Sequence, residues 1–288
     1  MDVIRDFDPW GDPLCTCPKK YGFNPYTGCP YHCRYCYITS YIPRAFECRP
    51  KKNLIARVER DLKRIDKHRV ISMSNSSDPY PPLEKKMKLT RSCLKIFMQY
   101  GCRRLLVVTK SDLVTRDADL LKQMQSAVSI TITTLDLELS RKLEPNAPSP
   151  QRRLKAIEKL ARKNIPVALR LDPIFPLLNE EVEEVVQAAA GRGIKHVTSS
   201  TFKPRPDSWR RMSETFPETM KKLEPLYFRQ GNKHHNCWYL PSLMRKKLMN
   251  RVKTSCEKLG LTFAPCREGF SELITAPSCD GSHLIKNR

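Results

Sequence analysis

The sequence predicts an α/β fold in which repeated strand–helix units build a parallel sheet. Short runs of β-branched and aliphatic residues alternate with longer segments of helical periodicity, and about six such units can be counted. The 288 residues are 40% hydrophobic, which is enough to fill a core and argues against a disordered chain. Neither a Walker loop nor a GxGxxG turn occurs among the ten glycines.

Helical periodicity and breaker residues mark the elements in order. Leu54, Val58 and Leu62 fall on one helical face ahead of the first apolar strand. Gly101 is suited to a helix C-terminus and Pro150 to a first helical position. The predicted helices of this region are 51–68, 90–100, 117–126, 150–163 and 180–190. The predicted strands are 70–73, 105–109, 128–134, 167–171 and 196–200.

Two prolines within 202–207 (FKPRPD) interrupt this rhythm and indicate an extended connection. We therefore expect three parts: an N-terminal segment with cysteines, a core, and a C-terminal extension that is a candidate for substrate binding. Their predicted bounds are 1–22, 23–205 and 206–288. The extension is predicted to contain helices at 207–224 and 242–259 and a hairpin-like tail at 263–285.

The charge balance favours a polyanionic partner. Fifty-two Lys and Arg face thirty Asp and Glu, a net charge of +22, so nucleic acid is the first expectation. The alternatives are solubility alone or an organism whose proteins are generally basic. The first fourteen residues carry four aspartates where a secretory signal would be basic and then apolar, and no run of eighteen apolar residues exists. We expect a cytoplasmic protein.

Twelve cysteines in such a chain favour metal or cluster binding over disulfides. Cys29, Cys33 and Cys36 form a CxxxCxxC motif within NPYTGCPYHCRYCY (24–37). Zinc usually takes four ligands, which would require His32 as the fourth, and this remains an alternative. An iron–sulfur cluster can be held by three thiolates with one iron left open, so a cluster is the favoured interpretation.

With an aromatic residue before its third cysteine and βα repeats after it, the motif resembles the radical S-adenosylmethionine (SAM) superfamily. More narrowly, the chain is similar to spore photoproduct lyases and related DNA-repair-photolyase-like proteins over about 15–205. The supporting stretches are SNSSDPYPPLEKKMKLTR (74–91), VVTKSDLVTRD (107–117), SITITT (129–134), LEPNAPSPQRRL (143–154) and, more weakly, APSCDGSHLI (276–285). The resemblance implies a partial (β/α)6 barrel of the TIM-like type with a helical and hairpin extension.

The resemblance also implies the chemistry. Cys29, Cys33 and Cys36 would hold three irons of a 4Fe-4S cluster, and SAM would chelate the fourth. One electron, from a donor such as ferredoxin or flavodoxin, would split the sulfonium bond and give a 5′-deoxyadenosyl radical that abstracts hydrogen from the substrate. The protein would orient the reactants and exclude water.

Cofactor contacts are expected where polar residues follow the predicted strands, although each could instead be an ordinary helix cap. Tyr35 would back the adenine, and Lys110 would pair with the methionine carboxylate or lie at a solvated strand end. Arg170, in an apolar strand, requires an anionic partner such as Glu144, Asp172 or the cofactor carboxylate. The full set of expected cofactor-binding residues is Tyr35, Ser74, Ser76, Asp78, Lys110, Thr131, Thr133 and Arg170.

Three residues are candidates for catalysis by resemblance. Tyr35 and Tyr37 match the proposed hydrogen-relay tyrosines of the lyases. Asn75 stands where those lyases carry the cysteine that donates hydrogen to the substrate radical. An amide N–H bond is too strong for that role, so either another thiol donates the hydrogen or the reaction differs.

A second group of cysteines could form another metal site. Cys15, Cys17, Cys266 and Cys279 would make a tetrathiolate site for zinc or an iron–sulfur cluster if the tail folds back beside the N-terminus. The alternative is that these are buried, inert thiols.

The sequence thus predicts a radical SAM enzyme that acts on nucleic acid, in DNA lesion repair of the lyase type or in RNA base modification. One alternative keeps the radical chemistry but acts on a protein or peptide. Another is a non-catalytic iron–sulfur or zinc module that binds nucleic acid.

Overall fold

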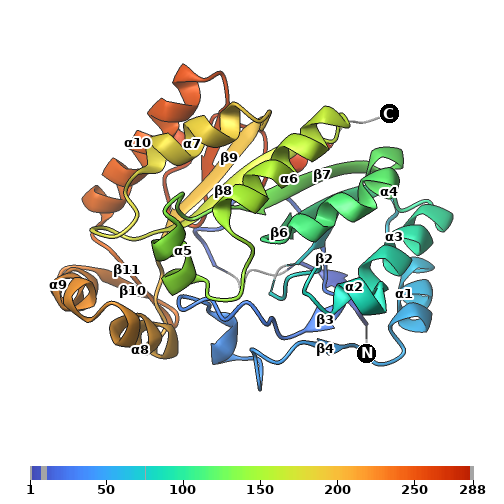
Figure 1. The fold of residues 1–288 in the computed structure, drawn as a ribbon, viewed down its shortest axis with the longest axis horizontal. Helices are drawn as coiled ribbons and strands as arrows, with labels where there is room; N and C mark the ends of the chain where they lie inside the picture. The colour runs from blue at the N-terminus through green and yellow to red at the C-terminus, as the bar shows by residue number, and fades with distance from the viewer. Residues whose placement is uncertain (1, 8–11, 75, 286–288) are drawn as a thin grey trace.

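A sheet of eight strands forms the centre of the computed structural model, which describes residues 2–7, 12–74 and 76–285 (Figure 1). The edge strand β1 is antiparallel to β2, and every other neighbouring pair is parallel. The strands follow the spatial order β1 (Ile4–Asp6), β2 (Tyr21–Phe23), β5 (Ile71–Met73), β6 (Arg104–Thr109), β7 (Gln125–Thr131), β8 (Val167–Ile174), β9 (His196–Thr201) and β12 (Thr262–Pro265). The predicted α/β class with a parallel sheet is confirmed.

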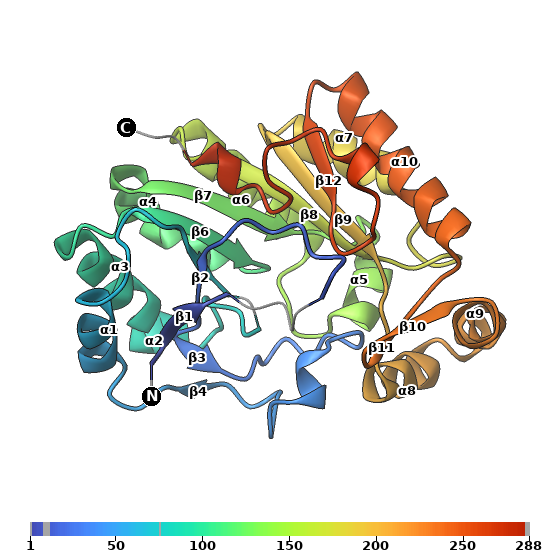
Figure 2. The same cartoon turned by 180° about the vertical axis from the view of Figure 1, so that it is seen from behind.

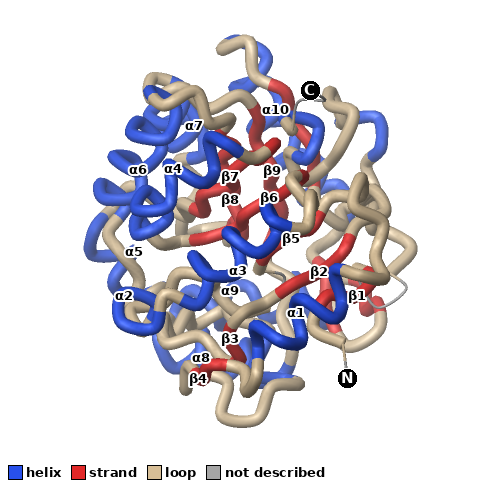
Figure 3. Tube along the Cα trace, turned by 90° about the vertical axis from the view of Figure 1, so that its right-hand side faces the viewer, coloured by secondary structure: helices blue, strands red, loops and turns tan. Residues whose placement is uncertain are grey.

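Helices cover one face of this sheet, with α4, α6 and α7 lying along its outer side (Figures 1 and 3). Their buried aliphatic residues meet those of the strands in one large core. This arrangement is typical of parallel sheets, because each βα crossover places its helix on the sheet. The helices between residues 54 and 190 are α1 (Leu54–Leu62), α2 (Glu84–Met87), α3 (Leu89–Gln99), α4 (Ala118–Gln123), α5 (Leu137–Leu143), α6 (Pro150–Arg162) and α7 (Val182–Ala190).

Most predicted core elements lie within a few residues of the observed ones. Pro150 begins α6 as expected, and the hydroxyl oxygen of Ser149 accepts a hydrogen bond from the backbone N–H of Arg152. The short strands β1 and β2 and the helices α2 and α5 were not predicted. Each spans three to seven residues, too short to show a clear period in the sequence.

The C-terminal extension differs from the prediction in two places. The helix predicted over 207–224 is two helices, α8 (Pro206–Thr215) and α9 (Pro217–Phe228). Phe216 separates them with a non-helical conformation, which is what a following proline favours. The hairpin is formed by β10 (Asn232–His234) and β11 (Cys237–Tyr239), ahead of α10 (Ser242–Lys258).

The tail predicted as a hairpin over 263–285 instead contributes β12 to the main sheet, parallel to β9. Two short 3-10 turns follow it, at Ser271–Leu273 and Ser282–Leu284. The physical reason is that Phe263 and Ala264 are fully buried there, whereas a solvent-facing hairpin would expose one of them.

The face of the sheet opposite the helices is covered by chain from both ends. From behind, the N-terminal segment runs across this face and meets the tail that follows β12 (Figure 2). The carboxyl ends of the parallel strands converge toward the same region, where ligands usually bind in such folds. Within the described residues, none of the helices has the length and apolarity that a membrane crossing requires.

Candidate active site

The three motif cysteines lie on a loop between β3 (Tyr26–Thr27) and a 3-10 turn at Ile38–Ser40. The backbone N–H of Cys29 donates to the carbonyl of Ala45 at 2.8 Å, and that of Arg34 donates to Leu143 at the end of α5 at 2.9 Å. Arg211 of α8 donates from Nη2 to the carbonyl of Cys36 at 2.6 Å. Contacts from three distant parts of the chain therefore fix the loop.

Gly28 is required at the start of this loop. Its φ is +78°, and an added Cβ would lie 2.2 Å from the carbonyl oxygen of Glu47. Gly101 has the same φ, but nothing lies within 4 Å of the corresponding position.

We expect Gly101→Ala to cost about 1 kcal/mol of stability from backbone strain alone. Gly28→Ala should cost about 1–3 kcal/mol more, because its clash is with backbone, and should lower iron loading. Urea unfolding and iron content of both variants test this, and equal behaviour of the two would contradict it.

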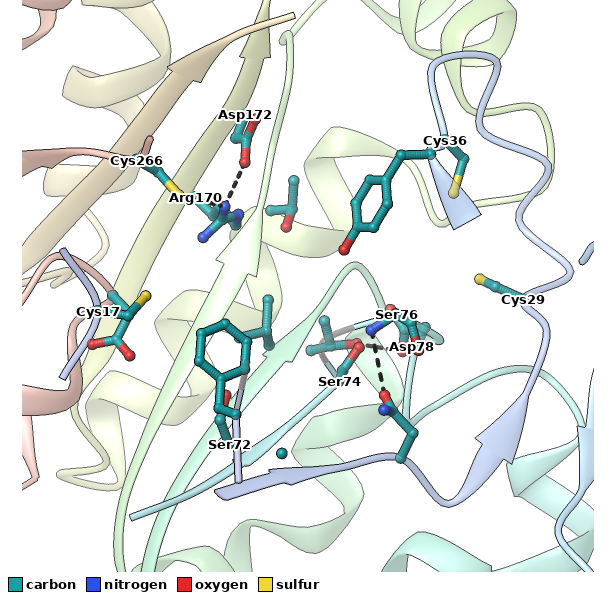
Figure 4. A pocket seen from close by; sticks show the side chains of 18 of the residues that line it. Cys17, Cys29, Cys36, Ser72, Ser74, Ser76, Asp78, Arg170, Asp172 and Cys266 are labelled. Atoms are coloured by element: carbon teal, nitrogen blue, oxygen red, sulfur yellow. Dashed lines mark hydrogen bonds and ion pairs between the residues drawn. The ribbon is translucent and has the colours of Figure 1, made fainter. Parts of the chain in front are cut away.

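The thiols of the triad influence one another. Desolvation is the main cause that raises the pKa of each of Cys29, Cys33 and Cys36 to about 12. In each case the charge of another thiol of the triad raises the pKa further. Thiols in this environment stay protonated unless a positive partner replaces the proton. Figure 4 shows Cys29 and Cys36 on the same side of the cavity.

The zinc alternative with His32 as fourth ligand is not favoured by the geometry. The imidazole of His32 stacks on the ring of Phe46, with the centroids 4.3 Å apart. As the side chains stand, no group of three or more His, Cys, Asp or Glu in the described part of the chain could hold a metal ion. A 4Fe-4S cluster is larger than one ion, and each thiolate binds a different iron.

The triad opens into a cavity of about 1060 Å³. Of the predicted cofactor and catalytic residues that the structure describes, all but Thr133 line this cavity. Those that line it are Tyr35, Tyr37, Ser74, Ser76, Asp78, Lys110, Thr131 and Arg170. Cys15, Cys17, Cys266 and Cys279 line it as well. Asn75 lies outside the described residues.

The loop after β5 brings three of these residues to the cavity (Figure 4). Ser74 adopts a φ of +78° and donates from Oγ to the carbonyl of Ser77 at 2.7 Å. The backbone N–H of Ser76 faces Oδ1 of Asn24 at 3.4 Å. The buried carboxylate of Asp78 accepts from Tyr80 N, Thr109 Oγ1 and Lys110 N at 2.7–2.9 Å, so it ties this loop to the end of β6.

A buried carboxylate, Glu144, joins four other side chains beside the triad. It forms an ion pair with Arg153, lies 3.7 Å from Lys110 Nζ, and accepts hydrogen bonds from Tyr35 and from Thr133. Burial acts to raise the pKa of Glu144, but the charges of Arg153 and Lys110 together hold it below its ordinary value. The hydroxyl of Thr133 donates to Glu144 at 3.2 Å, and Thr133 does not line the cavity.

Lys110 is not at a solvated strand end, because its side chain is only 16% exposed. Its Nζ lies 5.5 Å from the centroid of the Tyr35 ring, so Glu144 and Tyr35 together position this cation in the cavity.

Arg170 pairs with Asp172 at 2.6 Å, which is one of the partners expected for it. Tyr37 stacks with Tyr41 at 6.1 Å, and burial raises the pKa of Tyr37 to about 12.

Sequence reasoning missed Arg153 and Arg211. Arg153 is 1% exposed, although it directly follows the exposed Arg152 in a stretch rich in basic residues. One signal was available: Arg153 shares a helical face with Ile157 and Leu160, the apolar face of α6. Arg211 had no comparable signal for a role at the loop, because the two carbonyls that it contacts there, those of Arg34 and Cys36, lie 177 and 175 residues away.

The chain is similar in sequence to known proteins. The family model of the radical SAM superfamily matches residues 23–190. An uncharacterized protein of Methanocaldococcus jannaschii is 36% identical over 166 residues, which cover 54% of this chain and 61% of that protein. An uncharacterized protein of Mycobacterium tuberculosis is 27% identical over 256 residues, which cover 82% of this chain and 73% of the relative.

Solved structures share the fold. A spore photoproduct lyase mutant with bound AdoMet and dinucleoside spore photoproduct superimposes with a TM-score of 0.66 at 20% identity, covering 84% of this chain and 75% of the lyase. The radical SAM methyltransferase TsrM from Kitasatospora setae gives a TM-score of 0.56 at 12% identity, covering 91% of this chain and 57% of that enzyme.

Because the family model spans more than half of the chain, this chain belongs to the radical SAM superfamily. The protein is a radical SAM enzyme with a lyase-like fold.

Proposed function

We propose that Cys29, Cys33 and Cys36 hold a 4Fe-4S cluster, that SAM binds beside it, and that the enzyme abstracts hydrogen from a nucleic-acid substrate. The observation that carries the proposal is a single cavity in which the triad, a row of polar strand-end residues and many cations meet. Eleven of the lining residues are Lys or Arg and five are Asp. Such an excess of cations suits phosphate groups.

The residues present fit the two cofactors. Three mutually close thiols on a fixed loop leave one cluster iron for SAM, and the reduced cluster would supply the electron that releases the 5′-deoxyadenosyl radical. Lys110 would supply the cation for the methionine carboxylate, and its position depends on Glu144. Ser74 and Ser76 lie at the strand end where the methionine amine is expected. Tyr35 would back the adenine, and Thr131 would contact the ribose.

The nucleic-acid substrate is supported by the charge of the cavity and by likeness. A spore photoproduct lyase of the same fold was solved with a dinucleoside lesion. Because Asn75 cannot donate a hydrogen atom as a thiol can, the reaction need not be spore-photoproduct repair. DNA lesion repair and RNA base modification both remain within the proposal, with a ferredoxin or flavodoxin as electron donor.

Isotope transfer tests this function. The anaerobic, reconstituted and reduced protein is incubated with SAM and with uniformly deuterated DNA, RNA or peptide. Deuterium is then sought in 5′-deoxyadenosine by mass spectrometry. We expect label from DNA or RNA. Label from peptides alone would overturn the nucleic-acid proposal and favour the protein-modification alternative.

Salt-dependent binding gives a second expected result. Lys52 is an exposed cation at the edge of the cavity, whereas Lys222 is an exposed cation of α9 outside the cavity lining. The slope of log K against log salt should fall by about one for Lys52→Ala, since one phosphate contact is removed. Lys222→Ala should leave the slope unchanged. Fluorescence anisotropy with single-stranded and duplex oligonucleotides measures both, and equal slopes for the two variants would contradict the proposed binding face.

A further inference from the structure

Four cysteines gather on the side of the cavity opposite the triad. Cys15 and Cys17 lie in the N-terminal segment before β2, and Cys266 and Cys279 lie in the tail at and after the end of β12. The Sγ atoms of Cys17 and Cys279 are 3.4 Å apart although 262 positions separate the residues in the sequence. Figure 4 shows Cys17 and Cys266 on one side of the cavity, across from Cys29 and Cys36.

Buried ion pairs hold the two ends of the chain together at this point. Lys20, three residues after Cys17, pairs with Asp280, and their side chains are 4% and 8% exposed. Arg267, next to Cys266, donates from Nε to Asp12 at 2.6 Å. These contacts place one cysteine pair from each end in a fixed position, so the meeting of the four thiols is built into the fold.

Each of the four thiols interacts with at least one other. Cys279 donates a hydrogen bond to the sulfur of Cys17, and Cys15 interacts with Cys17 as well. Cys266 interacts electrostatically with Cys17, and its sulfur lies 3.5 Å from Nη2 of Arg170. Lys20 and Arg170 thus provide positive charge beside the group, as cations commonly do around thiolate metal sites.

We propose that Cys15, Cys17, Cys266 and Cys279 bind one thiophilic divalent metal ion of the Zn²⁺ class, which joins the N-terminal segment to the C-terminal tail. Four thiolates at about 2.3 Å from a tetrahedral ion are separated by about 3.8 Å. The 3.4 Å between Cys17 and Cys279 is close to that value. A cubane cluster would need its cysteine sulfurs further apart, because each binds a different iron.

Metal binding requires the thiol side chains to turn. As they stand, no three described His, Cys, Asp or Glu side chains are placed to hold an ion. The thiols instead contact one another through S–H···S hydrogen bonds, which draw Cys17 and Cys279 closer than a metal would. Cys15, Cys17 and Cys266 are only partly buried and lie in or beside loops, so rotation about their Cα–Cβ bonds can place the sulfurs around an ion as it displaces their protons.

The test is the zinc and iron content of the full-length protein, measured by inductively coupled plasma mass spectrometry. Wild type should carry about one zinc per chain in addition to cluster iron. A Cys29→Ala/Cys33→Ala/Cys36→Ala variant should lose the iron and keep the zinc, which separates this site from the proposed SAM cluster. Cys17→Ser/Cys279→Ser should lose about tenfold or more of the zinc. Cys237→Ser is the matched control, since Cys237 lines the same cavity from β11.

Three results would overturn the proposal. The first is the absence of zinc above the buffer background in both the wild-type protein and the triad variant. The second is a triad variant that keeps iron and sulfide on the remaining cysteines, which would indicate a second cluster. The third is a Cys17–Cys279 disulfide in the freshly purified protein, detected by alkylation under denaturing conditions. If Cys17→Ser/Cys279→Ser does not fold, release of zinc from wild type by a mercurial reagent still decides the question.

Discussion

Replacement of Cys29, Cys33 or Cys36 by alanine is expected to abolish both cluster assembly and SAM cleavage. Cys33 is buried and Cys29 and Cys36 are partly buried, and desolvation raises the pKa of each thiol to about 12, so in this pocket they become ligands only when iron displaces their protons. With two thiolates left, a cluster would lose its attachment to the fixed loop. The production of 5′-deoxyadenosine should therefore fall to the level of a protein-free mixture.

Cys102→Ala provides the control for this effect. Cys102 is 2% exposed and packs in the core between α3 and β6, so its removal tests the loss of a thiol without the loss of a motif ligand. This variant should retain full iron, sulfide and SAM cleavage. A triad variant that also retained them would refute the assignment of the cluster ligands.

Removal of the Glu144 carboxylate should be the most destabilising single change near the site. Glu144→Ala leaves Arg153 buried without its counter-charge and removes the partner that holds Lys110. Breaking such a buried pair typically costs about 3–5 kcal/mol. The loss should appear in urea unfolding of the anaerobic protein, and SAM affinity should fall with it because Lys110 and Tyr35 lose their shared acceptor.

Glu138 lies in α5, the helix that ends directly before Glu144, and offers a matched control. Its ion pair with Arg141 spans 2.7 Å, but both side chains are more than 60% exposed. Exposed pairs contribute little, so Glu138→Ala should change the stability by less than about 1 kcal/mol. Equal losses for Glu144→Ala and Glu138→Ala would show that the buried network has no special role.

The core was predictable from the sequence because short runs of β-branched and aliphatic residues alternate with helical patterns along it. Val167–Ile174 of β8 is buried along almost its whole length, and α6 begins at a visible proline. Such local signals can be recognised in the sequence without any knowledge of the fold. The division of the predicted helix over 207–224 was also encoded locally, in Pro217, but the helical pattern on both sides concealed it.

The site was only partly predictable, because its main interactions are long-range. Spacing predicted the triad and the predicted strand ends predicted Lys110 and Arg170, and the structure places all of them along one cavity. The sequence left Glu144 as one candidate partner for Arg170, whereas it pairs with Arg153, and only the packing of α6 against the strand ends distinguishes these arrangements. The convergence of Cys17 with Cys279 likewise depends on a tail strand that no periodicity revealed.

The central claim is that this triad holds a cluster at which SAM is cleaved reductively. The most direct measurement is the formation of 5′-deoxyadenosine and methionine by the anaerobic protein with SAM and dithionite, followed by mass spectrometry. We expect 5′-deoxyadenosine and methionine in equal amounts, and only when reductant is present. Protein with a full complement of iron and sulfide that binds SAM but yields neither product would contradict it.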